Sequence, residues 1–113
     1  MIEERSFKFA LSIIKLVKEL RNAKEFVFAD QILRSATSIG ANVAEAGAGQ
    51  SKKDFIHKMA IASKEARETR YWLKLLNESK LVLVDFSDYL EEIDQIIKIL
   101  TKIVKTSQRQ FKT

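Results

Sequence analysis

Hydrophobic residues recur along most of this chain at intervals of three and four positions, the period of an amphipathic α-helix. The sequence has no proline and three glycines, so few breaks interrupt the pattern. We expect helices over residues of about 3–22, 27–47, 51–77 and 86–108. Helices of this length joined by short links predict an all-α fold, an antiparallel up-down-up-down four-helix bundle. A chain of 113 residues is expected to form a single domain over residues 1–113.

The 3–22 helix carries two apolar stripes, which is more than a helix in a monomeric bundle needs. The first stripe, expected to face the core, comprises Phe7, Ala10, Leu11, Ile14 and Val17. The second stripe comprises Phe9, Ile13, Leu16 and Leu20. The 86–108 helix has core positions Phe86, Leu90, Ile93, Ile97, Leu100 and Val104, widened by Ile96, Ile99 and Ile103. We expect the second stripe and these last three isoleucines to form the subunit interface of a homo-oligomer.

The 27–47 helix combines a core stripe with an edge of small residues. The core stripe comprises Phe28, Ile32, Ala36, Ile39, Val43 and Ala46, and the edge comprises Ala29, Leu33, Gly40, Ala44 and Gly47. Glycine inside a helix costs about 1 kcal/mol relative to alanine, so we expect Gly40 to allow another helix to approach closely. A hinge or a ligand contact is the alternative. A polar row of Gln31, Ser35, Ser38 and Asn42 is either a solvated face or a set of buried interhelix hydrogen bonds.

Residues at the end of this helix and at the start of the next one both predict a turn between them. Gly47 or Gly49 is expected to take the left-handed conformation that ends many helices. Ser51 followed by Asp54 three residues later matches a capping box and predicts the start of the next helix.

The segment 79–85, SKLVLVD, alternates as a strand does, but the sequence offers no second strand to pair with it. We therefore expect a loop that tucks Leu81 and Leu83 under the bundle. Asp85 or Ser87 is expected to cap the helix that follows.

Composition limits the chemistry and the location of the protein. Hydrophobic residues make up 46% and charged residues 31%, as in a folded globular chain. The absence of cysteine excludes disulfides, thiolate nucleophiles and cysteine-ligated metals. No apolar run approaches the length of a membrane span, and acidic residues stand where a signal peptide needs basic ones. We expect a cytoplasmic protein without membrane contact.

Catalytic and metal-binding patterns are missing from the sequence. The single histidine, His57, cannot supply the two Glu-x-x-His pairs of a di-iron bundle or a full hydrolytic triad. Glu65 and Glu68 lie one turn apart, but basic neighbours on the same helix make surface ion pairs the simpler explanation. No glycine-rich phosphate loop occurs. We expect no enzymatic activity, no cofactor and no metal.

The basic residues suggest a polyanionic partner, since the formal net charge is +5. On the 51–77 helix, one side carries Lys53, Lys64, Arg67, Tyr71 and Lys74. On the 86–108 helix, one side carries Lys98, Lys102, Lys105 and Arg109, and no acid follows Asp94. Such stripes, with a tyrosine for stacking, are typical of contacts with the RNA or DNA backbone. The alternative is a solvated face, because acids at the start and lysines at the end of a helix also suit its dipole.

The residues of the two central helices resemble a known family. The pattern combines Arg34-x-Ala36-x-Ser38-Ile39-x-x-Asn42-Val43-Ala44-Glu45, a glycine-bearing turn, residues 51–56 (SKKDFI) and residues 62–73 (ASKEARETRYWL). It resembles the bacterial four-helix proteins called 23S rRNA intervening sequence proteins or S23 ribosomal proteins. Within this pattern, the family motif residues are Arg34, Ser38, Asn42, Glu45 and Glu68. Ala46 stands where many members have glycine.

The resemblance covers essentially the whole chain and implies a bundle that is not an enzyme. The family is similar to the accessory variability proteins of diversity-generating retroelements, which form ring-shaped homopentamers and are thought to bind nucleic acid. The resemblance therefore implies a homopentamer with an RNA or DNA partner, although family members are largely of unknown function. A second hypothesis is a protein-interaction scaffold in which the polar row or Trp72 meets a partner chain.

Overall fold

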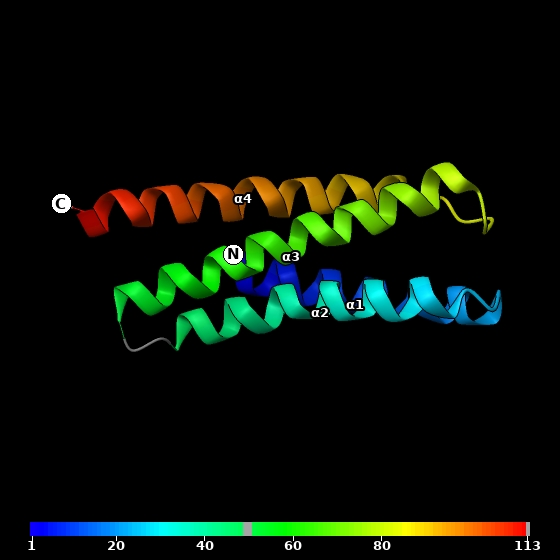
Figure 1. Cartoon of the computed structure of the whole chain (residues 1–113), viewed down its shortest axis with the longest axis horizontal. Helices are drawn as coiled ribbons and strands as arrows, with labels where there is room; N and C mark the ends of the chain where they lie inside the picture. Colours follow the sequence, from blue (N-terminus) through cyan, green and yellow to red (C-terminus); the bar gives the residue numbers. More distant parts are fainter. Residues whose placement is uncertain (49–50, 113) are drawn as a thin grey trace.

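The protein is a four-helix bundle in the computed structural model, which describes residues 1–48 and 51–112. The helices are α1 (Ile2–Asn22), α2 (Phe26–Gly47), α3 (Lys52–Ser79) and α4 (Ser87–Lys112). They lie along one axis of a body that measures 50 × 21 × 21 Å (Figure 1). This confirms the predicted all-α bundle. None of the helices in the described residues is long and apolar enough to cross a membrane.

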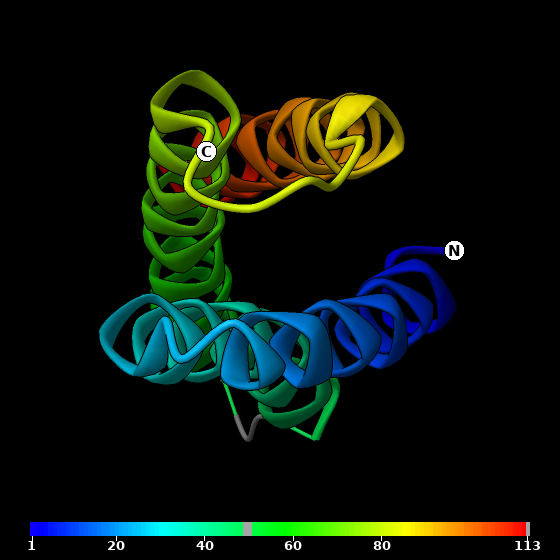
Figure 2. The same ribbon diagram turned by 90° about the vertical axis from the view of Figure 1, so that its right-hand side faces the viewer.

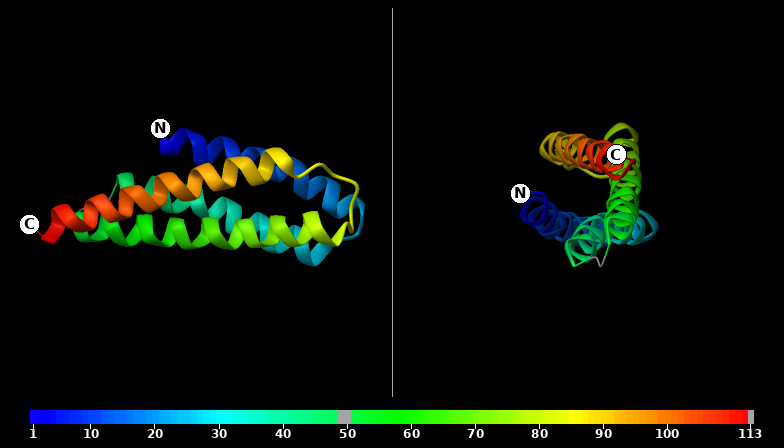
Figure 3. Two further views of the ribbon diagram at one scale, coloured as in Figure 1. Left: turned by 90° about the horizontal axis from the view of Figure 1, so that it is seen from above. Right: turned by 90° about the vertical axis from the view of Figure 1, so that its left-hand side faces the viewer.

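Helices that follow one another in the chain pack side by side, and the side between α1 and α4 has the least contact (Figure 2). There the two helices are joined by a two-pronged ion pair, from Arg5 Nε to Glu92 Oε2 at 2.6 Å and from Arg5 Nη2 to Glu92 Oε1 at 3.0 Å. Figures 1 and 3 show that α1 begins partway along the bundle. The end at which α3 begins and α4 finishes is therefore built from three helices.

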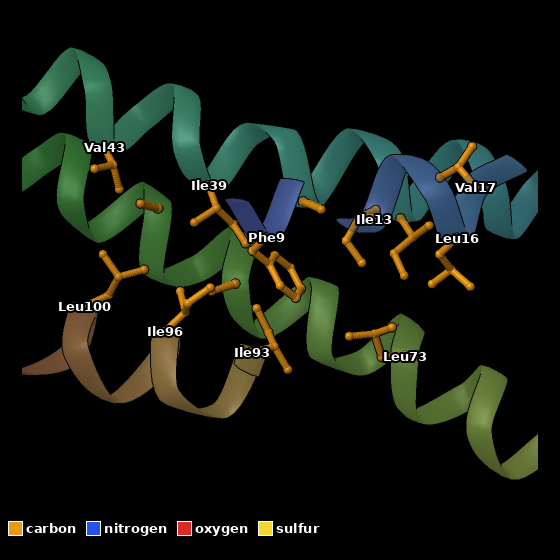
Figure 4. Close-up of a cluster of buried hydrophobic side chains, with 14 of the residues drawn as sticks. Phe9, Ile13, Leu16, Val17, Ile39, Val43, Leu73, Ile93, Ile96 and Leu100 are labelled. Carbon is orange, nitrogen blue, oxygen red and sulfur yellow. The ribbon is translucent and has the colours of Figure 1, made fainter. Parts of the chain in front are cut away.

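The core draws on all four helices (Figure 4). Its largest fully buried side chains are Ile13, Leu16, Leu20, Ile32, Ile39, Val43, Leu73, Leu76, Phe86, Ile93, Ile96 and Leu100. The predicted core stripe of α2 is confirmed, with Phe28 packed against it from a partly buried position. Spacings of three and four residues in each helix account for this continuous core.

The structure reverses the expected roles of the two α1 stripes. The residues predicted to form a subunit interface lie in the chain's own core, namely Phe9, Ile13, Leu16, Leu20 and Ile96, while Ile99 and Ile103 are partly buried against it. Phe7, Leu11 and Ile14, expected in the core, are 64%, 49% and 49% exposed. Val17, the last residue of that stripe, is buried as expected. The interface assignment is therefore wrong for the five residues buried in the core, and for Ile99 and Ile103 it stays a prediction. Both stripes are equally apolar, and only the position of α2 and α4 around α1 decides which one faces the bundle axis.

Lysines, not glycines, take the left-handed conformation at two helix ends. After α1, Lys24 has φ 63°, Glu25 N–H donates to Leu20 O at 2.9 Å, and Lys24 N–H donates to Arg21 O at 3.0 Å. These two bonds form a Schellman motif. Lys80 ends α3 with φ 56°.

The turn between α2 and α3 bears out one of its two predicted signals. Gly47 does not have a positive φ, and Ala48 after it has φ −97°, so Gly47 does not supply a left-handed cap. Gly49, the other candidate, lies outside the described residues. Ser51 caps α3 as expected, because its hydroxyl accepts the N–H of Asp54 at 3.1 Å.

The loop before α4 has the opposite orientation to the one expected. Leu81 is 49% exposed and Leu83 is fully exposed, whereas Val82 and Val84 pack against the core. The segment does alternate between inner and outer positions, as its sequence pattern indicates, but the valines take the inner positions and the leucines the outer ones. The prediction that the leucines tuck under the bundle was wrong.

Asp85 supplies the cap at the start of α4. Its Oδ1 accepts the N–H of Ser87 at 2.9 Å. Hydrogen bonding with the side chain of Ser87, and then with its backbone, lowers the pKa of the Asp85 carboxyl. Phe86 O accepts the N–H of Leu90 at 2.9 Å, which closes the first helical turn.

Two adjacent isoleucines of α1 provide a test of its orientation. Ile13→Ala should lower the free energy of unfolding by about 2–5 kcal/mol because it opens a cavity in the core. Ile14→Ala, the matched control, should cost less than about 1 kcal/mol because this side chain is half exposed. Denaturant unfolding of dilute protein measures both values. Equal losses would contradict the placement of α1.

Candidate nucleic-acid interface

The family-motif residue Arg34 joins α2 to α3. Its Nη1 lies 3.0 Å from Glu65 Oε1, and its Nη2 pairs with Glu68. Glu68 also accepts the indole N–H of Trp72 at 3.2 Å, and Phe28 meets the Trp72 ring edge-on at 6.1 Å. The two glutamates thus pair with an arginine of the neighbouring helix, not with bases of their own helix as the sequence suggested. A cross-helix partner could not be inferred from spacing within α3.

The polar row on α2 is divided between two roles. Ser35 is fully buried and accepts a hydrogen bond from the Thr69 hydroxyl of α3 at 2.8 Å. Asn42 Nδ2 donates to Ser38 O at 2.8 Å and to Ser38 Oγ at 3.1 Å, within the same helix. Gln31 is partly buried. The row is therefore a buried interhelix contact at Ser35 and a local, half-buried cluster at Ser38 and Asn42.

The remaining motif residue also belongs to the contact between α2 and α3. Glu45 Oε1 pairs with Lys58 Nζ of α3 at 3.2 Å. Three of the five motif residues, Arg34, Glu45 and Glu68, therefore bond across the two helices. These contacts stabilise the packing of α2 on α3.

The basic residues predicted on α4 share one surface. Lys98, Lys102, Lys105 and Arg109 are exposed and line a shallow hollow of about 350 Å³ together with threonines of the same helix. No ion pair within residues 1–48 and 51–111 involves any of these four. Their charges are therefore not neutralised by a carboxylate in contact with them.

Arg67 extends this surface onto α3. Its Nη2 donates to Thr101 Oγ1 of α4 at 3.2 Å, and Thr101 lines the same hollow as the four basic residues. We call Arg67 and these four α4 residues the basic face. Two acidic residues lie close in sequence to the basic face, and both form ion pairs with other arginines. Asp94 pairs with Arg70 at 2.7 Å, and Glu68 pairs with Arg34.

Three other residues predicted to bind nucleic acid, Tyr71, Lys74 and Lys53, line hollows other than that of the basic face. Tyr71 and Lys74 line a separate hollow of about 210 Å³ that also contains Glu78, so an acid offsets the lysine there. Lys64 is exposed on α3. Lys53 lies at the three-helix end, in a hollow with residues from the end of α4.

The sequence did not predict the apolar groove that lies between α1 and α2. Phe7, Leu11 and Ile14 form one wall, and Gly40 and Ala44 lie opposite them in a groove of about 330 Å³. The stripe itself was visible in the sequence, but it was assigned to the core. We call this groove, with its exposed wall, the apolar face.

The groove between α1 and α4 has mixed charge and does not fit a polyanion. It measures about 620 Å³, and its charged lining residues are Arg5, Lys8, Asp85, Asp88 and Glu92. The hydrogen bond with Glu92 raises the pKa of Arg5, while burial is the main cause that raises the pKa of Tyr89 beside them. In the described part of the chain, no three His, Asp or Glu residues lie close enough together to hold a metal ion.

Comparison with known proteins identifies the family. The sequence model of the 23S rRNA-intervening sequence protein matches residues 1–102. The chain belongs to this family. A crystal structure of a protein of unknown function from the S23 ribosomal protein family of Bacteroides thetaiotaomicron VPI-5482 is similar, with a TM-score of 0.89 and 45% sequence identity. The alignment covers 93% of this chain and 99% of that chain. No curated protein matches.

Membership in the 23S rRNA-intervening sequence protein family confirms the resemblance drawn from the central helices. The similar structure from the S23 family carries the same fold over nearly its whole length and is described as having unknown function. Family membership therefore establishes the fold of this chain, and its function has to be inferred from its surface.

The cross-helix arginine gives a stability test. Arg34→Met should lower the free energy of unfolding by about 1–2 kcal/mol, because Glu65, whose side chain is 13% exposed, loses its partner. Arg21→Met is the matched control, since Arg21 pairs with the well-exposed Asp30, and it should cost less than about 1 kcal/mol. Denaturant unfolding measures both. A larger loss for Arg21→Met would contradict the role of the α2–α3 contact.

Proposed function

We propose that this protein is a non-enzymatic, oligomeric helical bundle that binds nucleic acid, with RNA as its ligand, through the basic face. The observation that carries the proposal is the set of four exposed basic side chains on α4, joined by Arg67, without a carboxylate in contact with them. The family's name refers to an intervening sequence in 23S rRNA, which makes RNA the first ligand to test.

The spacing of these charges suits a phosphate backbone. At 1.5 Å per residue, Lys98 and Arg109 lie about 16 Å apart along α4, with one basic residue in each intervening turn. Each phosphate neutralised by such a residue releases condensed counterions, so binding gains free energy that depends on salt. The net charge of +5 adds a long-range attraction of the same sign.

The apolar face supports assembly of several copies. Phe7, Leu11 and Ile14 expose a continuous apolar wall that one chain does not cover. Gly40 opposite them is not required by packing within the chain, because a Cβ there would meet Ser6 at 3.6 Å, an ordinary contact. The absence of that methyl deepens the groove, which fits a second copy of the chain packed against it. The homopentamer implied by the family resemblance remains our expected assembly.

The two surfaces are compatible with each other. Figure 2 shows α4 on the side of the bundle opposite α1 and α2, with α3 running between α2 and α4. Copies joined through the apolar face would leave every basic face open, and repeated weak contacts would add avidity. The alternative of a protein scaffold relied on the polar row and Trp72, but Ser35 and Trp72 make hydrogen bonds within the chain. We therefore favour nucleic-acid binding.

Charge reversal on the basic face tests RNA binding. Lys98→Glu combined with Lys102→Glu changes the net charge by two units per site, from +5 to +1. Affinity for RNA should fall at least about tenfold at low salt, and the slope of log K against log[salt] should shrink by about 2. Fluorescence anisotropy over a salt series measures both quantities.

The matched control is Lys15→Glu combined with Lys18→Glu, two exposed lysines of α1 with the same change in net charge. This control should keep most of the affinity, because its lysines lie off the basic face. Equal losses in the two variants would show attraction by net charge alone and would defeat the assignment of the basic face.

Substitution in the apolar face tests assembly. The wild-type protein should sediment as a particle larger than one 13.0 kDa chain, and Leu11→Glu should dissociate it by placing a charge in the contact. Leu83→Glu, at a fully exposed leucine outside that face, should leave the assembly intact. A wild-type protein that sediments as a monomer at all concentrations would refute the oligomer.

A further inference from the structure

We propose that the three-helix end of the bundle holds a site for one unpaired nucleotide, with its base stacked on Phe111. The inference rests on the proposed binding of nucleic acid and specifies what kind is recognised. Phe111, Gln108, Lys53 and Ile56 line a hollow of about 270 Å³ between the end of α4 and the start of α3. Phe111 is 55% exposed, so much of its side chain is open to solvent.

The position of this hollow connects it to the basic face. Arg109, the last residue of the basic face in sequence, is adjacent to Gln108 and two residues before Phe111. Because α1 begins partway along the bundle, it does not cover this end (Figures 1 and 3). A strand that follows the basic residues of α4 toward the C-terminus would therefore reach the hollow directly.

The end of α4 is attached to α3 at this point. Lys52 Nζ donates to Gln110 Oε1 at 2.9 Å. This contact joins the first residue of α3 to the residue before Phe111, and it places the aromatic ring beside Ile56.

The lining residues provide three different kinds of contact with a nucleotide. The Phe111 ring offers a face for stacking, which is sequence-tolerant because every base has a π-face. The Gln108 amide can both donate and accept a hydrogen bond at a base edge. Lys53, in the first turn of α3, supplies a positive charge for a phosphate at the positive end of the helix dipole. Asp54 is in the same turn, and its carboxylate opposes part of this charge.

The geometry favours an unpaired base over a base pair. In a duplex, the faces of the bases are covered by their neighbours, and the A-form major groove is too deep and narrow for side chains to read. An exposed ring at the end of a row of cations can stack on an unpaired base, whose face is open, and not on a base inside a duplex. We therefore expect RNA with an unpaired loop or end to bind more tightly than fully paired RNA.

The experiment compares a hairpin RNA that has an unpaired loop with a blunt duplex of the same length. Phe111→Ala should weaken binding of the hairpin by about 5- to 150-fold, the range found when one base–aromatic stack is removed, and leave binding of the duplex unchanged. Phe111→Tyr keeps the aromatic ring and should retain hairpin binding. Circular dichroism checks that the variants are folded.

A fluorescence experiment keeps the test valid if Phe111→Ala fails to fold. Phe111→Trp in a Trp72→Phe background places the only tryptophan of the chain in the hollow. Its emission should be quenched by the hairpin and not by the duplex. The wild-type residue Trp72, half-buried against Phe28, serves as the control and should not respond to either RNA.

The possible results separate this inference from the function on which it rests. If Phe111→Ala weakens binding of both RNAs equally, or of neither, the nucleotide site is refuted while binding through the basic face stands. If the wild-type protein binds neither RNA, the nucleotide site and the proposed function are both refuted.

Discussion

The contact between α2 and α3 is the constraint on which the rest of the structure depends. Arg34 spans two glutamates of α3, and buried Ser35 accepts a hydrogen bond from Thr69 in the middle of the same seam. A buried polar pair is stable only when both partners are in place, so these bonds fix how α3 sits along α2. The hairpins on either side, α1 with α2 and α3 with α4, are positioned through this seam. Its residues include much of the motif that marks the family.

Ion pairs of α3 with α2 and with α4 explain why the basic face is unneutralised. Glu65 and Glu68 lie on the α2 side of α3 and are taken up by Arg34, and Asp94 is taken up by Arg70. The carboxylates nearest to the basic face thus serve packing between helices. The lysines of the basic face are exposed and make no ion pair in the described residues. Ion pairs between helices, which hold these acids at the surface, are therefore one physical cause of the unneutralised charge on the basic face.

The sequence predicted the features that depend on the spacing of residues within one helix, and it missed those that depend on contacts with other helices. Helix positions, the Ser51 cap and the core stripe of α2 followed from spacing within one segment. The orientation of α1 did not, because its two stripes are equally apolar and the choice between them is made by α2 and α4. The left-handed Lys24 and Lys80 were also missed, since lysine has no preference of its own for that conformation; at Lys24, two hydrogen bonds of the helix end favour it. The basic residues of α4 were identified correctly as a stripe, but their connection to Arg67 through Thr101 required the structure.

The small contact between α1 and α4 leaves α1 held to the bundle mainly through α2. α1 is tied to α2 through the short link Ala23–Glu25, and one ion pair, Arg5 with Glu92, bridges it to α4. Hinge segments and terminal elements with limited contacts are the parts that proteins swap between identical subunits. A domain-swapped bundle, in which α1 of one molecule completes the core of another, would keep every buried apolar contact and need only a different path for the link.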